Sequence, residues 1–137
     1  MTRSALLALL AIAALAPVHA ADLTIRIDNV GSSEGQLMVA VYDGAATFLR
    51  QPLRSAAAAA SAGSTTVVVR DLAPGDYGIA VYHDANGNGK MDTNMMGIPV
   101  EPIAFGRDAQ GTMGPPSFDA VKLAVPAAGL ATSVTLR

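Results

Sequence analysis

The sequence has no cysteine and no tryptophan, and it contains only two histidines among its 137 residues. Without cysteine the chain forms no disulfide, binds no metal through thiolates and carries no lipid on an N-terminal cysteine. His19 lies in a segment that we interpret below as a signal peptide, so His83 is the one remaining histidine. A zinc site built from several nitrogens or thiolates is therefore excluded, and the fold must be stabilised by packing alone.

Charged and aromatic residues are scarce as well. Charged residues make up 15% of the chain, the formal net charge is −2, and Lys and Arg are not clustered. Nucleic acids and anionic membrane surfaces attract clustered Lys and Arg, so neither is expected as a partner. Aromatic residues make up 4% of the chain, which weakens an interpretation based on stacking of sugars.

Residues that could form a catalytic centre are few. Ser117, His83 and an aspartate would supply the residue types of a hydrolytic triad, but no glycine-flanked nucleophile motif surrounds the serine. A triad is defined by its geometry, which a sequence does not give. We therefore predict that the protein is not an enzyme. We expect His83 to end a strand and to orient Asp84 or a loop carbonyl through a ring nitrogen.

Residues 1–20 have the pattern of a secretory signal peptide. Arg3 supplies the positive start, Ala5–Ala16 an apolar run, and Val18-His19-Ala20 a cleavage site with small residues. The apolar run is shorter than the roughly 20 residues that span a bilayer, so we predict no membrane span. The expected organisation is a signal peptide over 1–20 and a single domain over 21–137, which is periplasmic or secreted after cleavage near Ala20.

The rest of the chain is dominated by short β-strand patterns. Alternating or β-branched runs predict strands at 22–30, 36–42, 65–70, 77–83, 118–125 and 130–136. The segment 53–62 contains an alanine run with high helix propensity, but its place between regularly spaced strands favours a strand. We expect 65–70 and 77–83 to form a hairpin, with a type II turn over Ala73–Asp76 in which Gly75 takes positive φ. The pattern predicts an all-β fold, an antiparallel β-sandwich of about seven strands.

The exception is a long loop from Asp84 to Pro116, and its first part spaces oxygen-bearing side chains two residues apart. Asp84, Asn86, Asn88, Lys90 and Asp92 take the first, third, fifth, seventh and ninth positions of a calcium loop, with Gly89 at the sharp turn. Met95 replaces the carboxylate of the twelfth position, so Glu101 is the nearest candidate for a further ligand. The alternative is a turn in which the Asn-Gly pairs only supply positive φ angles.

A second pattern in this loop suggests a different metal. Methionines are concentrated here and His83 precedes them; the four in the loop are Met91, Met95, Met96 and Met113. Soft thioether sulfur suits Cu(I), so a copper carrier is one alternative function. The other explanation is that flexible methionine side chains seal an irregular loop against the core. We likewise expect Phe105 and Phe118 to be core residues.

Four ordered motifs along the chain resemble an exported bacterial family known as domain of unknown function 2141. The motifs are Leu72–Tyr77 (LAPGDY), His83–Asp92 (HDANGNGKMD), Gly97–Glu101 (GIPVE) and Gly114–Phe118 (GPPSF). The resemblance implies an exported β-sandwich of transthyretin-like or immunoglobulin-like kind with no established activity. The first turn also resembles that of collagen-adhesin B-type repeats, some of which hold calcium. That analogy implies Asp84, Asn86, Asn88, Asp92 and the Lys90 carbonyl as ligands.

The sequence therefore predicts an exported, non-enzymatic β-sandwich in which Ca²⁺ orders the loop from Asp84 to Glu101. The expected partners are the calcium ion and an unidentified envelope or extracellular component. The alternatives are the copper carrier and a module that binds a peptide or glycan on a sheet face.

Overall fold

The computed structural model describes residues 20–137 of the chain. Eight strands account for about half of it: β1 Ala21–Val30, β2 Gln36–Tyr42, β3 Arg54–Ala59, β4 Gly63–Leu72, β5 Gly75–Asp84, β6 Ile103–Phe105, β7 Lys122–Val125 and β8 Leu130–Thr135. The helical elements are one turn each, η1 Gly106–Asp108 and α1 Phe118–Val121. Residues 1–19 of the predicted signal peptide lie outside the described residues. No helix in the described part is long and apolar enough to cross a membrane.

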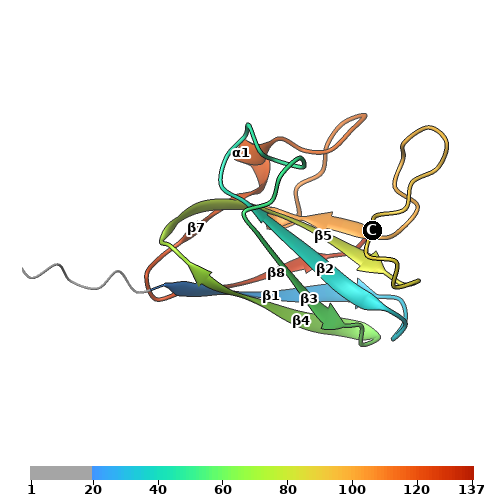
Figure 1. Ribbon diagram of the computed structural model, residues 1–137, viewed down its shortest axis with the longest axis horizontal. Helices are drawn as coiled ribbons and strands as arrows, with labels where there is room; N and C mark the ends of the chain where they lie inside the picture. The colour runs from blue at the N-terminus through green and yellow to red at the C-terminus, as the bar shows by residue number, and fades with distance from the viewer. Residues whose placement is uncertain (1–19) are drawn as a thin grey trace, which may run out of the picture.

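The strands form two sheets that pack face to face (Figure 1). One sheet has three strands in the order β4-β1-β8. The other has five: β3-β2-β5-β6 follow one another, and β7 pairs with β5 along the same edge as β6. The predicted all-β sandwich is confirmed.

The core lies between the sheets and follows the alternation of the strands. In β1, Leu23, Ile25 and Ile27 are fully buried, whereas the residues between them are exposed or half-buried. β2 buries Leu37, Val39 and Val41 in the same way. Because successive side chains of a strand point to opposite faces, each strand gives one apolar row to the core. The predicted strand over 53–62 is confirmed as β3, whose Ala56 and Ala58 pack against the core.

The predicted hairpin of β4 and β5 is wrong. β4 pairs with β1 in one sheet and β5 pairs with β2 in the other, so the turn carries the chain across the sandwich. The positive φ lies at Asp71 (φ 61) rather than at Gly75, so the predicted type II turn is also wrong. Leu72 and Tyr77, on either side of the turn, are both buried in the core, and the Tyr77 hydroxyl donates to the Ala73 carbonyl. Burial of these two side chains outweighs the local preference for a hairpin.

Three further details differ from the sequence prediction. β1 and β8 pair in parallel, so the sandwich is not wholly antiparallel. The predicted strand 118–125 begins as α1, because the Ser117 hydroxyl oxygen caps the helix by accepting from the Ala120 N–H. The predicted long loop also contains the short strand β6, which pairs with β5.

Candidate functional site

The loop that joins β5 to β6 lies at one end of the sandwich, near the C-terminus (Figure 1). Its first residue, Asp84, is the last of β5 and lies opposite Gln36 of β2. Its far end is fixed by two hydrogen bonds between β6 and the C-terminal residue, because Ile103 and Arg137 exchange N–H and carbonyl groups. The loop is therefore anchored at its start by the pairing of β5 with β2. It is anchored at its end by the hydrogen bonds between β6 and Arg137.

Asp84 is the anchor of this loop. Its side chain is fully buried. One carboxylate oxygen accepts from the Asn88 N–H at 3.2 Å. The other accepts from the Gly89 N–H at 2.9 Å and from the Gln36 side-chain amide at 3.2 Å. These bonds fold the Asp-Asn-Gly segment back over the end of the sheet. The role of Asp84 as a calcium ligand stays a prediction.

Asp92 is surrounded by the two asparagine side chains of the pattern. Asn86 donates its amide to one oxygen at 2.6 Å, and Asn88 donates to the other at 2.8 Å. The pKa of Asp92 is held below its usual value, first by the hydrogen bond from Asn88, then by the neighbouring Glu101 carboxyl group and by the hydrogen bond from Asn86, with a smaller contribution from the charge of Lys90. The side-chain oxygens of Asn86 and Asn88 accept the N–H groups of Asn88 and Lys90.

Glu101 brings a second carboxyl group to Asp92. Both of its oxygens are shielded from solvent, and neither has a donor among residues 20–137. Burial raises the pKa of Glu101 to about 7, helped by the neighbouring Asp92 carboxyl group and by the negative charge of Asp84. Glu101 has no donor of its own and lies beside a second carboxyl group, so the pair lacks a positive partner once both groups are ionised.

Tyr82 shows that negative charge is concentrated at this end of the sheet. Its hydroxyl donates to the Gly89 carbonyl at 3.3 Å. The pKa of Tyr82 is raised, first by burial and then by the charges of Asp84, Glu101 and Asp92. All three carboxyl groups therefore act on one phenol. They do not form a compact cage, because no group of three His, Asp or Glu side chains in the described residues is arranged to hold a metal ion.

The raised pKa of Glu101 gives a testable dependence of stability on pH. The folded-state pKa of Glu101, about 7, lies above its usual 4.5, so folding stabilises the protonated form. That stabilisation is complete below pH 4.5 and is lost as the pH rises through about 7. After allowance for solvent screening, we expect the free energy of unfolding in chelator to fall by about 1 kcal/mol. Urea titrations across this range measure it. Glu101→Gln should remove most of the slope, and an unchanged slope would contradict this assignment.

Three of the four loop methionines do not share the surroundings of His83. His83 is buried, and its Nε2 lies 2.7 Å from the Glu34 carbonyl oxygen in the turn between β1 and β2. The ring therefore orients that turn rather than Asp84 or its loop. Met95, Met96 and Met113 are fully exposed, with relative exposures of 106%, 83% and 104%. These three side chains neither converge on His83 nor seal the loop against the core.

A small hairpin within the loop was not foreseen from the sequence. Thr93 and Pro99 form a β-bridge, and the Asn94 side-chain oxygen accepts the N–H groups of Met96 and Ile98. Gly97 takes φ +77 at its tip. The signal was present, because an asparagine followed three residues later by a glycine is typical of a tight turn. The hairpin holds Met95 and Met96 away from the sandwich, whereas Met113 lies outside it.

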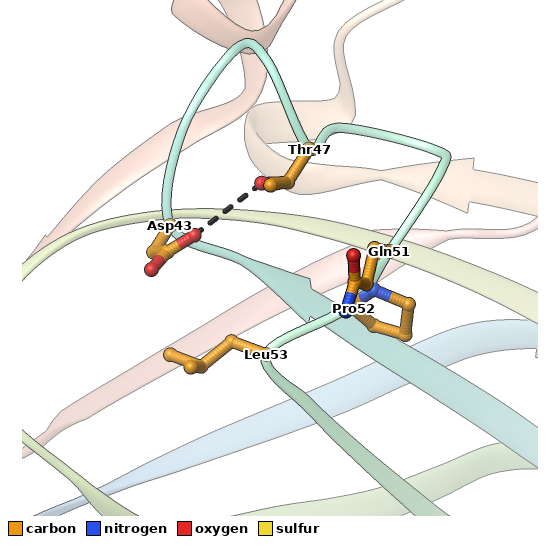
Figure 2. A pocket seen from close by; sticks show the side chains of 5 residues that line it. All are labelled: Asp43, Thr47, Gln51, Pro52 and Leu53. Atoms are coloured by element: carbon orange, nitrogen blue, oxygen red, sulfur yellow. Dashed lines mark hydrogen bonds between the residues drawn. The ribbon is translucent and has the colours of Figure 1, made fainter.

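A different part of the molecule shows an open hollow at the other end of β2 (Figure 2). It measures about 370 Å³ and is lined by Asp43, Thr47, Gln51, Pro52 and Leu53. The Thr47 hydroxyl donates to Asp43 at 3.3 Å, as the dashed line in Figure 2 shows. With a single carboxylate, this lining has no arrangement suited to catalysis or to a metal.

Phe105 and Phe118, expected in the core, are instead half-buried outside it. Both pack against Phe48, with ring centroids 6.4 and 6.0 Å apart, and Phe48 also contacts Tyr42. Phe105 lies opposite Ala80 in the pairing of β6 with β5, and Ala80 alternates with the core residues Ile79 and Val81. The four rings therefore form an aromatic cluster on the outer face of the five-stranded sheet.

Comparison with known proteins agrees with the motifs. Residues 25–133 match the model of a bacterial family described as "Uncharacterized protein conserved in bacteria (DUF2141)". The chain belongs to this family. The match includes every strand except the first residues of β1 and the last of β8, and it includes the whole Asp84–Glu101 loop. Searches of curated proteins and of solved structures gave no match.

Proposed function

We propose that this member of the DUF2141 family is an exported, non-enzymatic β-sandwich in which Ca²⁺ binds to the Asp84–Glu101 loop and orders it. The observation that carries the proposal is the Glu101 carboxyl group, which is shielded from solvent, has no donor among residues 20–137 and faces Asp92. A hard cation with oxygen ligands would replace the proton on Glu101 and neutralise the two carboxylates.

The residues around the pair fit this ion in part. Asp92 and Glu101 supply two adjacent carboxyl groups, and Asn86 and Asn88 contact Asp92. Both asparagines now point their amide nitrogens at Asp92, so their oxygens would ligate only after a change in side-chain orientation. The Asp84 carboxylate already accepts three hydrogen bonds, two of which come from N–H groups of the loop. Lys90 contributes its N–H to Asn88, and its carbonyl remains a proposed ligand.

The non-enzymatic part of the proposal is supported by the residues that resembled a triad. The Ser117 hydroxyl oxygen caps α1, and the His83 ring lies against the Glu34 carbonyl. The serine and the histidine are thus engaged in different structural roles.

Calcium titration of wild type and Glu101→Gln tests the calcium site. A dissociation constant of about 10⁻⁴ to 10⁻³ M is usual for extracellular calcium modules. At about tenfold excess over that constant, calcium should stabilise the wild type by roughly 1.4 kcal/mol and raise its Tm by about 5 °C. Glu101→Gln should lose this shift because it removes one of the two adjacent carboxylates. Differential scanning calorimetry in calcium and in chelator measures the shifts.

Asp119→Asn is the matched control. It makes the same change of charge at a side chain that is 83% exposed and lies outside the loop. This variant should keep the full calcium shift, and potassium chloride at equal ionic strength should give none. If wild type melts at the same temperature in calcium and in chelator, the loop is only a turn and the proposal is wrong.

A further inference from the structure

The five-stranded sheet ends on one side in an open strand. β3 lies at the end of the strand order and, among residues 20–137, it pairs with β2 alone. Arg54, Ser55, Ala57 and Ala59 are exposed along it. An edge strand of this kind presents a row of unpaired N–H and carbonyl groups, which is a template for another strand.

The register of β3 identifies which residues present these groups. The Ala60 N–H donates to the Gly35 carbonyl, one step beyond the pairing of Ala59 with Gln36. In an antiparallel ladder only alternate residues bond to the partner strand. The backbone N–H and carbonyl groups of Ala56 and Ala58 therefore point toward β2. Those of Ser55, Ala57 and Ala59 point away from β2, toward the open edge.

This edge lacks the features that interrupt the edges of β6, β8 and β4. β6 has three residues and is joined to Arg137 next to its end. The Thr135 N–H at the end of β8 donates to the Asp108 carboxylate. β4 turns away through Asp71, where its pairing with β1 is irregular. Pro52 lies before β3 and Arg54 is its first residue, so neither a proline nor a charge interrupts the rest of the strand. The register of Arg54–Ala59 with β2 has no shift.

We propose that β3 is an interface on which a second copy of this chain pairs, antiparallel and about a twofold axis at Ala57. This register places Ala57 opposite Ala57 and Ser55 opposite Ala59, and it allows about six interchain hydrogen bonds. The two Arg54 side chains then lie at opposite ends of the interface. A parallel pairing would place them side by side, where like charges repel.

The second copy fits this edge better than an unrelated strand because the edge is complementary to itself. The facing side chains are alanine and serine, which leave room for a close approach in both copies. The pairing brings the exposed Leu53 of each copy beside the Ala59 end of the other. An open hollow of about 350 Å³, lined by Gly35, Gln36, Ala59 and Gly87, lies at that end. One short strand buries less than a typical stable interface, so the dimer should be reversible, with Kd on the order of 10⁻⁵ M.

A charged side chain at position 57 tests the proposed twofold axis directly. The test is carried out without calcium. Because Ala57 faces its own copy, Ala57→Lys and Ala57→Glu should each weaken self-association by a factor of up to about five through like-charge repulsion. An equimolar mixture of the two should regain association, because lysine then faces glutamate. Sedimentation velocity of the intact chain in chelator, over a range of concentrations up to about 1 mM, measures each case. Ala131→Lys and Ala131→Glu, at an exposed alanine of β8, are the controls and should associate like wild type.

Three outcomes would overturn the proposal. Wild type could sediment as a monomer at every concentration, which is the result expected if the edge accepts only a strand of another protein. Both Ala57 variants could associate as wild type does. The mixture could also remain monomeric although both variants fold, which would place the axis elsewhere. Equal melting temperatures of the variants in chelator would establish that they fold.

Discussion

Asp84→Ala is expected to lower the free energy of unfolding by about 3 kcal/mol, even in chelator. The buried carboxylate accepts from the Asn88 and Gly89 N–H groups and from the Gln36 amide. A hydrogen bond to a charged group contributes roughly 1.5–3 kcal/mol, and a buried donor left without a partner adds a cost of its own. Urea denaturation at pH 7 in chelator measures the loss.

Asp43→Ala is the control for this prediction, because Asp43 is exposed and accepts one hydrogen bond, from the Thr47 hydroxyl. It should cost no more than about 1 kcal/mol. Amide exchange adds a local measurement, since the N–H groups of Asn88 and Gly89 should be protected in wild type and lose protection in Asp84→Ala. Equal losses in the two variants would mean that Asp84 does not anchor the loop.

The strand positions followed from the sequence because burial imposes a period of two on each strand. Leu23, Ile25 and Ile27 alternate with polar residues in β1, and the pattern locates the strand and its buried face without further information. The alanine run of β3 carries almost no such signal. It was assigned correctly from its place between other strands, because helix propensity alone is a weak guide in a folded protein.

The pairing of strands was much harder to foresee. The turn between β4 and β5 has residues common to hairpins, yet the chain crosses to the other sheet there. What decides this is the simultaneous burial of Leu72 and Tyr77 between two layers, a property of the whole sandwich rather than of the turn. The same holds for the parallel pairing of β1 with β8, which joins residues far apart in the sequence.

The loop was recognised from its spacing, but the roles within it were not. The spacing treats Asp84 and Asp92 alike, since both are aspartates in one pattern. In the structure Asp84 ends a central strand and is buried, whereas Asp92 lies farther out and meets Glu101. The sequence named Glu101 as a candidate only because it is the nearest acid. Its shielded oxygens depend on how the chain returns to β6, which no local pattern encodes.

Gly35→Ala is expected to lower the free energy of unfolding by about 3 kcal/mol or more. A Cβ at this position would lie 2.0 Å from the Asp84 carbonyl oxygen, and Gly35 takes φ +66. The φ angle costs an alanine roughly 1–2 kcal/mol, and forcing the backbone at the end of β5 to move adds about 1–3 kcal/mol. Because the Gly35 carbonyl also accepts from Ala60, the strain should reach β3 as well.

Gly87→Ala separates the two contributions, because Gly87 takes φ +68 and nothing in the described structure lies within 4 Å of an added Cβ. It should cost only the strain of the φ angle, roughly 1–2 kcal/mol. Urea denaturation of both variants in chelator gives the difference, which measures how tightly the turn between β1 and β2 packs under Asp84. We also expect Gly35→Ala to weaken calcium binding, since a displaced Asp84 no longer holds the loop beneath Asp92 and Glu101. If Gly35→Ala and Gly87→Ala lower the free energy of unfolding equally, the close packing of Gly35 against Asp84 does not determine the position of the loop.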